Sequence, residues 1–383
     1  MNTERHCLTR ERCEVVLPSA RAWKSVWAGA AVLILFTALP VFGGTITVTN
    51  TEDSGPGSLR AAIASAASGD TINFSLTLPA TITVSTALTI DSSGSKSLTI
   101  SGPGAGSLAI SGGDSVPVFV IQPLAGLGGP VIATISGVTI EKGSSLLGGG
   151  IFNAGTLTLN NTTVSGNGNS PGTQLGGGIF NAGTLTLNNS TVSFNGANPS
   201  SATAGLGGGI YNLGTLTLNH SRVTSNSAFG PFPSIGRGGG IYNSLPGTVT
   251  LIDSTVSNNS TRFSIEGGLF LGGGYGGGIY NDRGIVTLTK SAVLNNFSGG
   301  GPTGIPLSGA GIANDGGHIF LTNSTVAGNH TPASGGSGAG FSNSGNLSLS
   351  NSTVSGNSAS SGGGGIGNGP GAVVTREEFH PGE

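Results

Sequence analysis

The chain contains few charged and few aromatic residues. Charged residues make up 8% of its 383 residues and aromatic residues 5%, whereas Gly occurs 72 times. A typical globular domain carries about 25% charged residues and about 7% Gly. The glycines do not follow the three-residue period of collagen. A hydrophobic content of 36% with a net charge of −2 excludes the composition of a disordered chain. The composition therefore indicates an ordered, Gly-rich repeat protein.

Cysteine is confined to the beginning of the chain. Cys7 and Cys13 both lie within residues 1–43, which start with basic residues and continue with the apolar run 26–39 of 14 residues. This run is shorter than the roughly 20 residues of a membrane span. The pattern predicts a secretory signal peptide over 1–43, with an uncleaved anchor as the alternative. Without this segment the chain has no cysteine for a disulfide or a thiolate metal site, and no transmembrane segment is expected.

Charge and motifs narrow the expected partners. Removal of residues 1–43 leaves 9 Lys+Arg and 13 Asp+Glu, a net charge of −4. Nucleic-acid binding depends on basic groups that neutralise phosphates, so no nucleic-acid partner is expected. No phosphate-binding loop or metal-ligand spacing is present, and we expect neither a cofactor nor a metal. With the predicted signal peptide, a secreted or cell-envelope location is expected.

A repeat occupies residues 148–370. The motif GGGIFNAGTLTLNNTTVSGN recurs with variations at intervals of 25 to 38 residues. Within each unit, GGGI(F/Y)N, TLTL and STV have the two-residue alternation of short strands, and no helical period occurs. Such strands bury a face only when successive units stack, which predicts an all-β, right-handed parallel β-helix of about 8 coils. A β-propeller is the competing fold, but it requires four strands and about 40 to 45 residues per blade.

Asparagine recurs at two positions of the unit. Stacked amides can hydrogen-bond along a solenoid, so both columns are predicted to be structural. The first column is Asn153, Asn181, Asn212, Asn243, Asn281, Asn314 and Asn343, and the second is Asn167, Asn195, Asn226, Asn259, Asn296, Asn329 and Asn357.

Residues 44–147 contain less regular strand patterns and one short helical pattern. Ser58 is a suitable N-cap, and Leu59 and Ile63 share a face of the helix that follows. Because a solenoid must cover its first open coil, this helix is predicted to be an N-terminal cap. Residues 371–383 are expected to form a polar tail, and whether the chain is truncated there is left open.

Two segments carry a family resemblance. TITVTNTEDSGPGSLRAAIASAASGDTINF resembles the N-terminal motif of secreted bacterial right-handed β-helix proteins. The repeated GGGI…N with a following SxxN is similar to the repeats of polymorphic outer membrane proteins and related adhesin-type proteins of the pectin-lyase-like fold. The resemblance implies export, a location at the outer membrane surface, and this fold. It does not imply an activity, since the fold hosts lyases, hydrolases, esterases and adhesins.

Carboxylates are the first candidates for chemistry, because the resemblance implies that enzymes of this fold work with clustered acids. The repeats offer only Asp253, Glu266, Asp282 and Asp315, and this scarcity argues against catalysis. Asp282 and Asp315 follow the anchor Asn in adjacent units and are expected about 4.8 Å apart. Such a pair could serve glycoside hydrolysis or bind a cation, or it could be ordinary turn chemistry offset by Arg283.

A second candidate set interrupts a column of asparagines. His220, Asp253 and Lys290 occupy equivalent positions in three consecutive units. They could form a catalytic or ligand-binding row. The alternative is a structural column in which opposite charges replace paired amides.

Aromatic residues precede the first five anchor asparagines of the repeat. Strand alternation turns these rings away from the core, where an exposed row would suit sugar rings or a partner protein. The alternative is that the segment before each glycine triplet folds over them. The row is Phe152, Phe180, Tyr211, Tyr242 and Tyr280.

The segments before the glycine triplets vary in length while the strands do not. Such loops on a rigid scaffold commonly bind ligands, so recognition is predicted there, beside Tyr242 and Tyr280. The predicted ligand-binding residues of these segments are Phe229, Phe232, Arg237, Arg262, Phe263, Glu266, Phe270 and Tyr275. Together these observations predict a non-catalytic protein that recognises a surface glycan or a protein of a host or neighbouring cell. The alternative is a polysaccharide lyase or glycoside hydrolase with its site near Asp253, Asp282 and Asp315.

Overall fold

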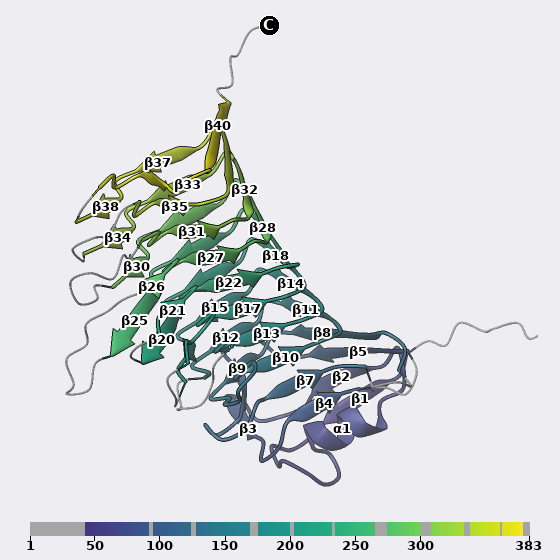
Figure 1. The fold of residues 1–383 in the computed structure, drawn as a ribbon. Coiled ribbons are helices and arrows are strands. Elements are labelled where there is room, and N and C mark those ends of the chain that lie inside the picture. The colour runs from purple at the N-terminus through teal and green to yellow at the C-terminus, as the bar shows by residue number, and fades with distance from the viewer. Residues whose placement is uncertain are drawn as a thin grey trace, which may run out of the picture. The chain divides into compact units, whose positions relative to one another are not determined.

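A computed structural model describes residues 43–91, 95–123, 128–168, 175–199, 203–231, 234–264, 274–299, 308–332, 338–360 and 362–377. These residues belong to one compact unit of parallel strands and one short helix (Figure 1). Residues 1–42 lie outside the described part, so the signal peptide stays a prediction. No helix of the described residues is long and apolar enough to cross a membrane.

Three long sheets run along the stack of coils, and a complete coil contributes one strand to each sheet. The 12-stranded first sheet contains β1 (Thr45–Val48), β2 (Thr71–Phe74), β5 (Lys96–Ser101), β8 (Val131–Ser136), β11 (Thr156–Asn160), β14 (Thr184–Asn188), β18 (Thr215–Asn219), β23 (Thr248–Ile252), β28 (Ile285–Thr289), β32 (His318–Thr322), β36 (Asn346–Ser350) and β40 (Val373–Glu377). The 10-stranded second sheet contains β3 (Ala80–Thr83), β6 (Leu108–Ser111), β9 (Thr139–Glu141), β12 (Thr163–Ser165), β15 (Thr191–Ser193), β19 (Arg222–Thr224), β24 (Thr255–Ser257), β29 (Ala292–Leu294), β33 (Thr325–Ala327) and β37 (Thr353–Ser355).

The 10-stranded third sheet holds the strands that end in the first column of asparagines. It contains β4 (Leu88–Ile90), β7 (Phe119–Ile121), β10 (Ile151–Asn153), β13 (Ile179–Asn181), β17 (Ile210–Asn212), β22 (Ile241–Ser244), β27 (Ile279–Asp282), β31 (Ile312–Asp315), β35 (Phe341–Asn343) and β39 (Ile366–Asn368). The strands from β10 to β39 mark the eight predicted coils of the repeat. The pairings are parallel and in the expected register, as between Asn153 and Asn181. The predicted right-handed parallel β-helix is therefore confirmed.

A fourth sheet was not expected from the sequence. It lies in the segments that were predicted only as loops, and a two-stranded ladder lies beside it. Their strands are β16 (Gly196–Ala197), β20 (Ser227–Pro231), β25 (Ser260–Ser264), β30 (Phe297–Ser298), β34 (His330–Thr331) and β38 (Ser358–Ala359), then β21 (Gly236–Arg237) and β26 (Gly274–Tyr275). The variable segments thus begin as further paired strands before their lengths diverge.

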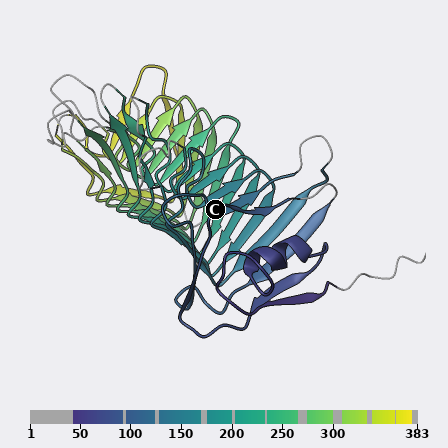
Figure 2. The same cartoon turned by 90° about the horizontal axis from the view of Figure 1, so that it is seen from below.

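The ends of the stack differ from each other. The helix α1 (Leu59–Ser65) packs on β1 and β4 beside the first coils (Figure 2). The Ala61 N–H donates to Oγ of Ser58, which is the predicted N-cap. At the other end, β40 pairs with β36, so part of the segment predicted as a polar tail extends the first sheet instead.

Apolar and amide side chains fill the interior in columns. Leu157, Leu185 and Leu216 stack on the inner face of the first sheet, each with 0% exposure. Both predicted asparagine columns are hydrogen-bonded from coil to coil, and both are buried except at the half-buried Asn357. Asn153 Nδ2 donates to Asn181 Oδ1 at 2.7 Å, and the second column repeats this contact with an added backbone N–H donor. Each amide so satisfies backbone groups that the coil turns would otherwise leave unpaired.

A column of hydroxyls also supports the turns and was missed in the sequence. The Oγ of Ser190, Ser221, Ser254, Ser291, Ser324 and Ser352 each accepts a backbone N–H from the preceding coil. The sequence carried a signal for this column, because each of these serines directly precedes the strand that its unit contributes to the second sheet.

Candidate functional site

The row of aromatic residues is a stack of rings inside the protein. Centroids of neighbouring rings from Phe152 to Tyr280 lie 5.1 to 5.3 Å apart, and the ring planes differ by 3° to 16°. Phe180 is 6% exposed and Tyr280 also 6%. The prediction of an exposed stripe is therefore wrong, and the alternative, that the preceding segment covers the rings, holds.

The segments that cover the rings are themselves paired from coil to coil and form a ladder, called here the covering ladder. The residue before each glycine triplet pairs with its counterpart in the next coil, and Leu175 and Leu206 pack on the rings. Side chains that point away from the core therefore meet a second layer of chain. In the following two coils this position is taken by Arg237 and Tyr275, where leucines stood before. The side chains of the covering ladder therefore change from apolar to polar at Arg237.

Tyrosine hydroxyls connect the row to the residues that follow the anchor asparagines. Tyr242 Oη donates to Asp282 Oδ2 at 3.0 Å, and Tyr280 Oη donates to Asp315 Oδ2 at 2.8 Å. Burial raises the pKa of both phenols above the ordinary value, and the two carboxylates raise it further. Each aspartate thus accepts a hydrogen bond from a tyrosine one coil away.

The two aspartates lie in register, as the sequence predicted. Asp282 and Asp315 are direct partners in the pairing of β27 with β31, and Arg283 Nε donates to Asp282 Oδ1 at 2.9 Å. No group of three or more potential metal-ligating His, Cys, Asp or Glu residues occurs among the described residues. The two aspartates therefore accept structural hydrogen bonds, and among the described residues no third potential metal ligand joins them.

Asp253 does not join this pair. Asp253 directly follows β23, whereas Asp282 and Asp315 come shortly before β28 and β32 of the same sheet. A strand of five residues, about 16 Å long, therefore separates Asp253 from the pair. The alternative enzyme site, which needed Asp253 beside Asp282 and Asp315, is therefore not assembled.

The row of His220, Asp253 and Lys290 is a column of turn residues. All three have positive φ, between 47° and 49°, and asparagines hold the same conformation at equivalent places. His220 Nε2 lies 3.9 Å from Asp253 Oδ2, with the side chains 66% and 40% exposed. A solvated contact of this length contributes little. The left-handed turn, which asparagine tolerates better than most other non-glycine residues, explains the column without a catalytic role.

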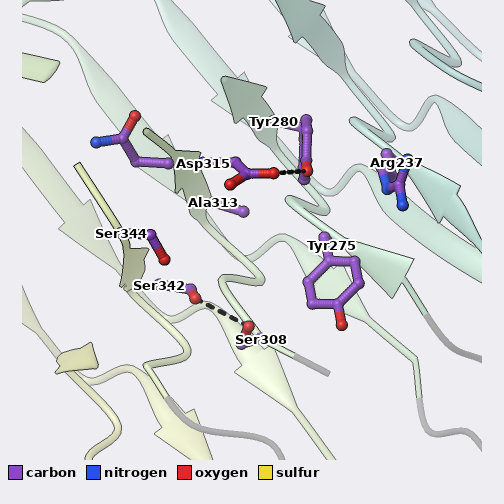
Figure 3. Close-up of a pocket in the computed structure, with 9 residues that line it drawn as sticks. Arg237, Tyr275, Tyr280, Ser308, Ala313, Asp315, Ser342 and Ser344 are labelled. Carbon is purple, nitrogen blue, oxygen red and sulfur yellow. Dashed lines mark hydrogen bonds between the residues drawn. The ribbon is translucent and has the colours of Figure 1, made fainter. Parts of the chain in front are cut away.

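A cavity opens where the aromatic row ends. Its volume is about 350 Å³, and Figure 3 shows its lining side chains, which come from three successive coils and from the covering ladder. Ala313 takes the ring position after Tyr280, and Ser342 takes the position after that. The lining is Arg237, Tyr275, Tyr280, Ser308, Ala313, Asn314, Asp315, Ser342 and Ser344.

The cavity combines groups of different chemistry. The Arg237 guanidinium carbon lies 5.6 Å from the centroid of Tyr280, and its buried Nε has no hydrogen-bond partner among the described residues. Tyr275 meets Tyr280 edge-on at 6.4 Å. Ser308 Oγ donates to Ser342 Oγ at 2.9 Å, and Asp315 is exposed. A cation, an anion, hydroxyls and two rings thus surround one small space.

The predicted ligand-binding residues divide into four groups. Arg237, Tyr275 and Tyr280 line the cavity, whereas Tyr242 is buried in the row beneath it. Phe229 and Arg262 are register partners in the fourth sheet, so they belong to a paired strand and not to a free loop. Phe232, Glu266 and Phe270 lie outside the described residues, as does the side chain of Phe263.

Sequence reasoning missed the residues that create the space. Ala313 and Ser342 were readable as departures from an aromatic column, because they directly precede anchor asparagines. Ser344 was also readable, because it follows the anchor Asn343 as Asp282 and Asp315 follow theirs. Ser308 could be placed only once the covering ladder was known.

Comparison with solved structures finds two similarities at low sequence identity. The structure is similar to the crystal structure of pectate lyase Pel9A, with 16% sequence identity over 84% of this chain and 79% of that chain and a TM-score of 0.43. It is also similar to ORF18 of Geobacillus virus E2, with 13% identity over 87% of this chain and 62% of that chain and a TM-score of 0.33. No protein-family model and no curated protein sequence matches the chain.

Proposed function

We propose that this protein is a secreted or cell-envelope β-helix that recognises a surface glycan without cleaving it. The observation that carries the proposal is the cavity at the end of the aromatic row. Binding sites for small ligands combine apolar walls with a few convergent polar groups, and this cavity has both. The location rests on the signal-peptide pattern of residues 1–43.

The arrangement of acids favours binding over catalysis. Glycoside hydrolysis requires two carboxyl groups that flank the bond to be cleaved, one of them free to act as nucleophile or base. Here Asp315 accepts the hydroxyl of Tyr280, and Asp282 accepts the hydroxyl of Tyr242 and faces Arg283. Both carboxylates therefore already serve partners within the fold.

A polysaccharide panel tests the proposal. The purified protein is assayed for binding to immobilised neutral and acidic polysaccharides, and the same mixtures are assayed for unsaturated products and new reducing ends. We expect saturable binding to at least one polymer and no products. Asp315→Asn should weaken that binding, because the cavity loses its anionic acceptor. Asp253→Asn is the matched control, since Asp253 lies at the far end of β23 and does not line the cavity.

Two results would contradict the proposal. Release of products from any polymer by the wild-type protein, abolished in Asp315→Asn, would make the protein an enzyme. Absence of binding to every polymer would remove glycan recognition.

A further inference from the structure

We propose that the cavity holds a single neutral hexopyranose at the end of a glycan chain, and that Ala313 determines whether it can enter. This inference rests on the proposed function and names its ligand. It depends on the geometry of the aromatic row and on the charges around the cavity.

The row shows why the space exists. Five consecutive coils place a ring at this position, and the register places Ala313 and then Ser342 at the next two. With a spacing of 5.1 Å between Tyr242 and Tyr280, one further ring would lie above Ala313 and fill part of the cavity. Two small residues in succession therefore provide a space that earlier coils fill with their own side chains.

The volume limits the ligand to one ring. About 350 Å³ is at the low end of the range of roughly 300 to 1,000 Å³ for small-molecule sites. Tyr275 and Tyr280 both line the cavity and supply an apolar wall on which the C–H face of a pyranose can pack. A space of this size takes one ring, which suits a terminal unit because it needs room for one ring and a single outgoing linkage.

The charges favour a neutral sugar. Arg237 and Asp315 offset each other in the lining, and Ser344 is an exposed hydroxyl beside them. A hexose can donate hydroxyl protons to the Asp315 carboxylate and accept from the Arg237 guanidinium, because both side chains line the cavity. A uronate would place a second anion near Asp315 and meet like-charge repulsion.

Tyrosine hydroxyls in the row indicate how the sugar is oriented. Tyr242 and Tyr280 each reach the residue after the anchor asparagine one coil further, which is Asp282 or Asp315. For the Ala313 coil the equivalent acceptor is Ser344. A sugar hydroxyl directed at Ser344 would take the place that a tyrosine hydroxyl takes in the other coils.

The experiment measures binding of methyl glycosides by saturation-transfer difference NMR and by displacement from the polymer that binds in the panel. The probes are the methyl pyranosides of glucose, galactose and mannose, with methyl galacturonide as the acidic counterpart. We expect at least one neutral glycoside to bind about tenfold more tightly than methyl galacturonide, since one unfavourable charge contact is of that order.

Ala313→Tyr is the decisive variant. It should reduce neutral-glycoside binding at least tenfold without lowering the melting temperature, because a tyrosine would complete the row. Ala292→Tyr, on the outer side of β29 in the second sheet, is the matched control and should bind as the wild type does. If the first variant does not fold, Asp315→Asn tests the same site and should lose the preference for the neutral sugar.

The outcomes separate the inference from the proposed function. Tighter binding of methyl galacturonide, or unchanged binding in Ala313→Tyr, overturns the inference while glycan recognition stands. Binding of polymers but of no methyl glycoside also overturns it, because an internal segment is then recognised. Failure to bind any polymer or glycoside overturns both.

Discussion

Tyr280 donates its hydroxyl to Asp315 across one coil, at 2.8 Å between Oη and Oδ2. This contact joins the buried aromatic row to the edge of the cavity, because Tyr280 is 6% exposed and Asp315 is exposed. A change at one residue therefore alters both the packing of the row and the charge that a ligand meets.

Removal of this hydroxyl should cost little stability. Tyr280→Phe keeps the ring, as at Phe180 in the same row, and deletes one hydrogen bond to a carboxylate. Because Asp315 remains solvated, we expect a loss of about 1 kcal/mol in the free energy of unfolding. Urea denaturation measures it. Tyr211→Phe is the control with a neutral partner, Ser244, and should cost less. Equal losses in the two variants would argue against a specific role of the carboxylate.

Alkaline titration of the tyrosines reports on the burial of the aromatic row. The chain has 4 tyrosines, and Tyr211, Tyr242, Tyr275 and Tyr280 all have a pKa raised by burial. A raised pKa in the folded state contributes stability that is fully present below the unfolded value of 10.0 and is lost as pH rises above it. We expect phenolate absorbance to rise only together with loss of the β-sheet circular dichroism signal. A phenolate signal near pH 10 in the folded protein would show that the rings are accessible.

The second asparagine column should be most sensitive in the middle of the stack. Asn226 Nδ2 donates to Asn259 Oδ1 and to the Val192 carbonyl, and its own Oδ1 accepts from Asn195. Asn226→Ala leaves several buried groups unpaired and should cost about 3 kcal/mol. Asn357→Ala, at the half-buried end of the column, should lower the free energy of unfolding by only about 1 kcal/mol. Urea denaturation of both variants tests the gradient, and a larger loss at Asn357 would contradict it.

The repeat predicted the fold because its signals are local and redundant. Alternating leucines, the glycine triplets and two asparagine columns all specify the same stacking of coils, and the structure has them in that register. The capping helix could also be predicted, since Ser58 and the apolar face that follows lie within one short segment.

The site could be predicted only in part because it depends on a second layer of chain. Alternation correctly turned Tyr280 away from the core, but it carries no information on what lies outside. The covering ladder of Leu206 and its counterparts forms between coils, in segments of variable length. The cavity depends on Ala313 and Ser342, which were readable as departures from the aromatic column, and on covering residues such as Ser308, which were not.

The N-terminal cap should weaken in acid. Asp53 Oδ1 accepts from Arg60 of α1 at 2.6 Å, while Arg60 also donates to the carbonyls of Thr86 and Ala87. Partial burial would raise the pKa of Asp53, but the hydrogen bonds from Ser85 and Arg60 outweigh it and the net pKa is lowered. A lowered pKa contributes stability that is present above the unfolded value of 3.8 and is lost as pH falls through the folded value.

Asp53→Asn isolates this contribution. At neutral pH the variant should be about 1 kcal/mol less stable than the wild type, since the pair is partly solvated. The difference should shrink as the pH falls below 3.8, where the wild-type carboxylate also becomes neutral. Hydrogen exchange of the amides of α1 measures opening of the cap separately from unfolding of the repeats. Glu52→Gln, at the exposed neighbouring residue, controls for the loss of one negative charge. If that control loosens α1 as much as Asp53→Asn does, the ion pair with Arg60 is not what holds the cap to the first coils.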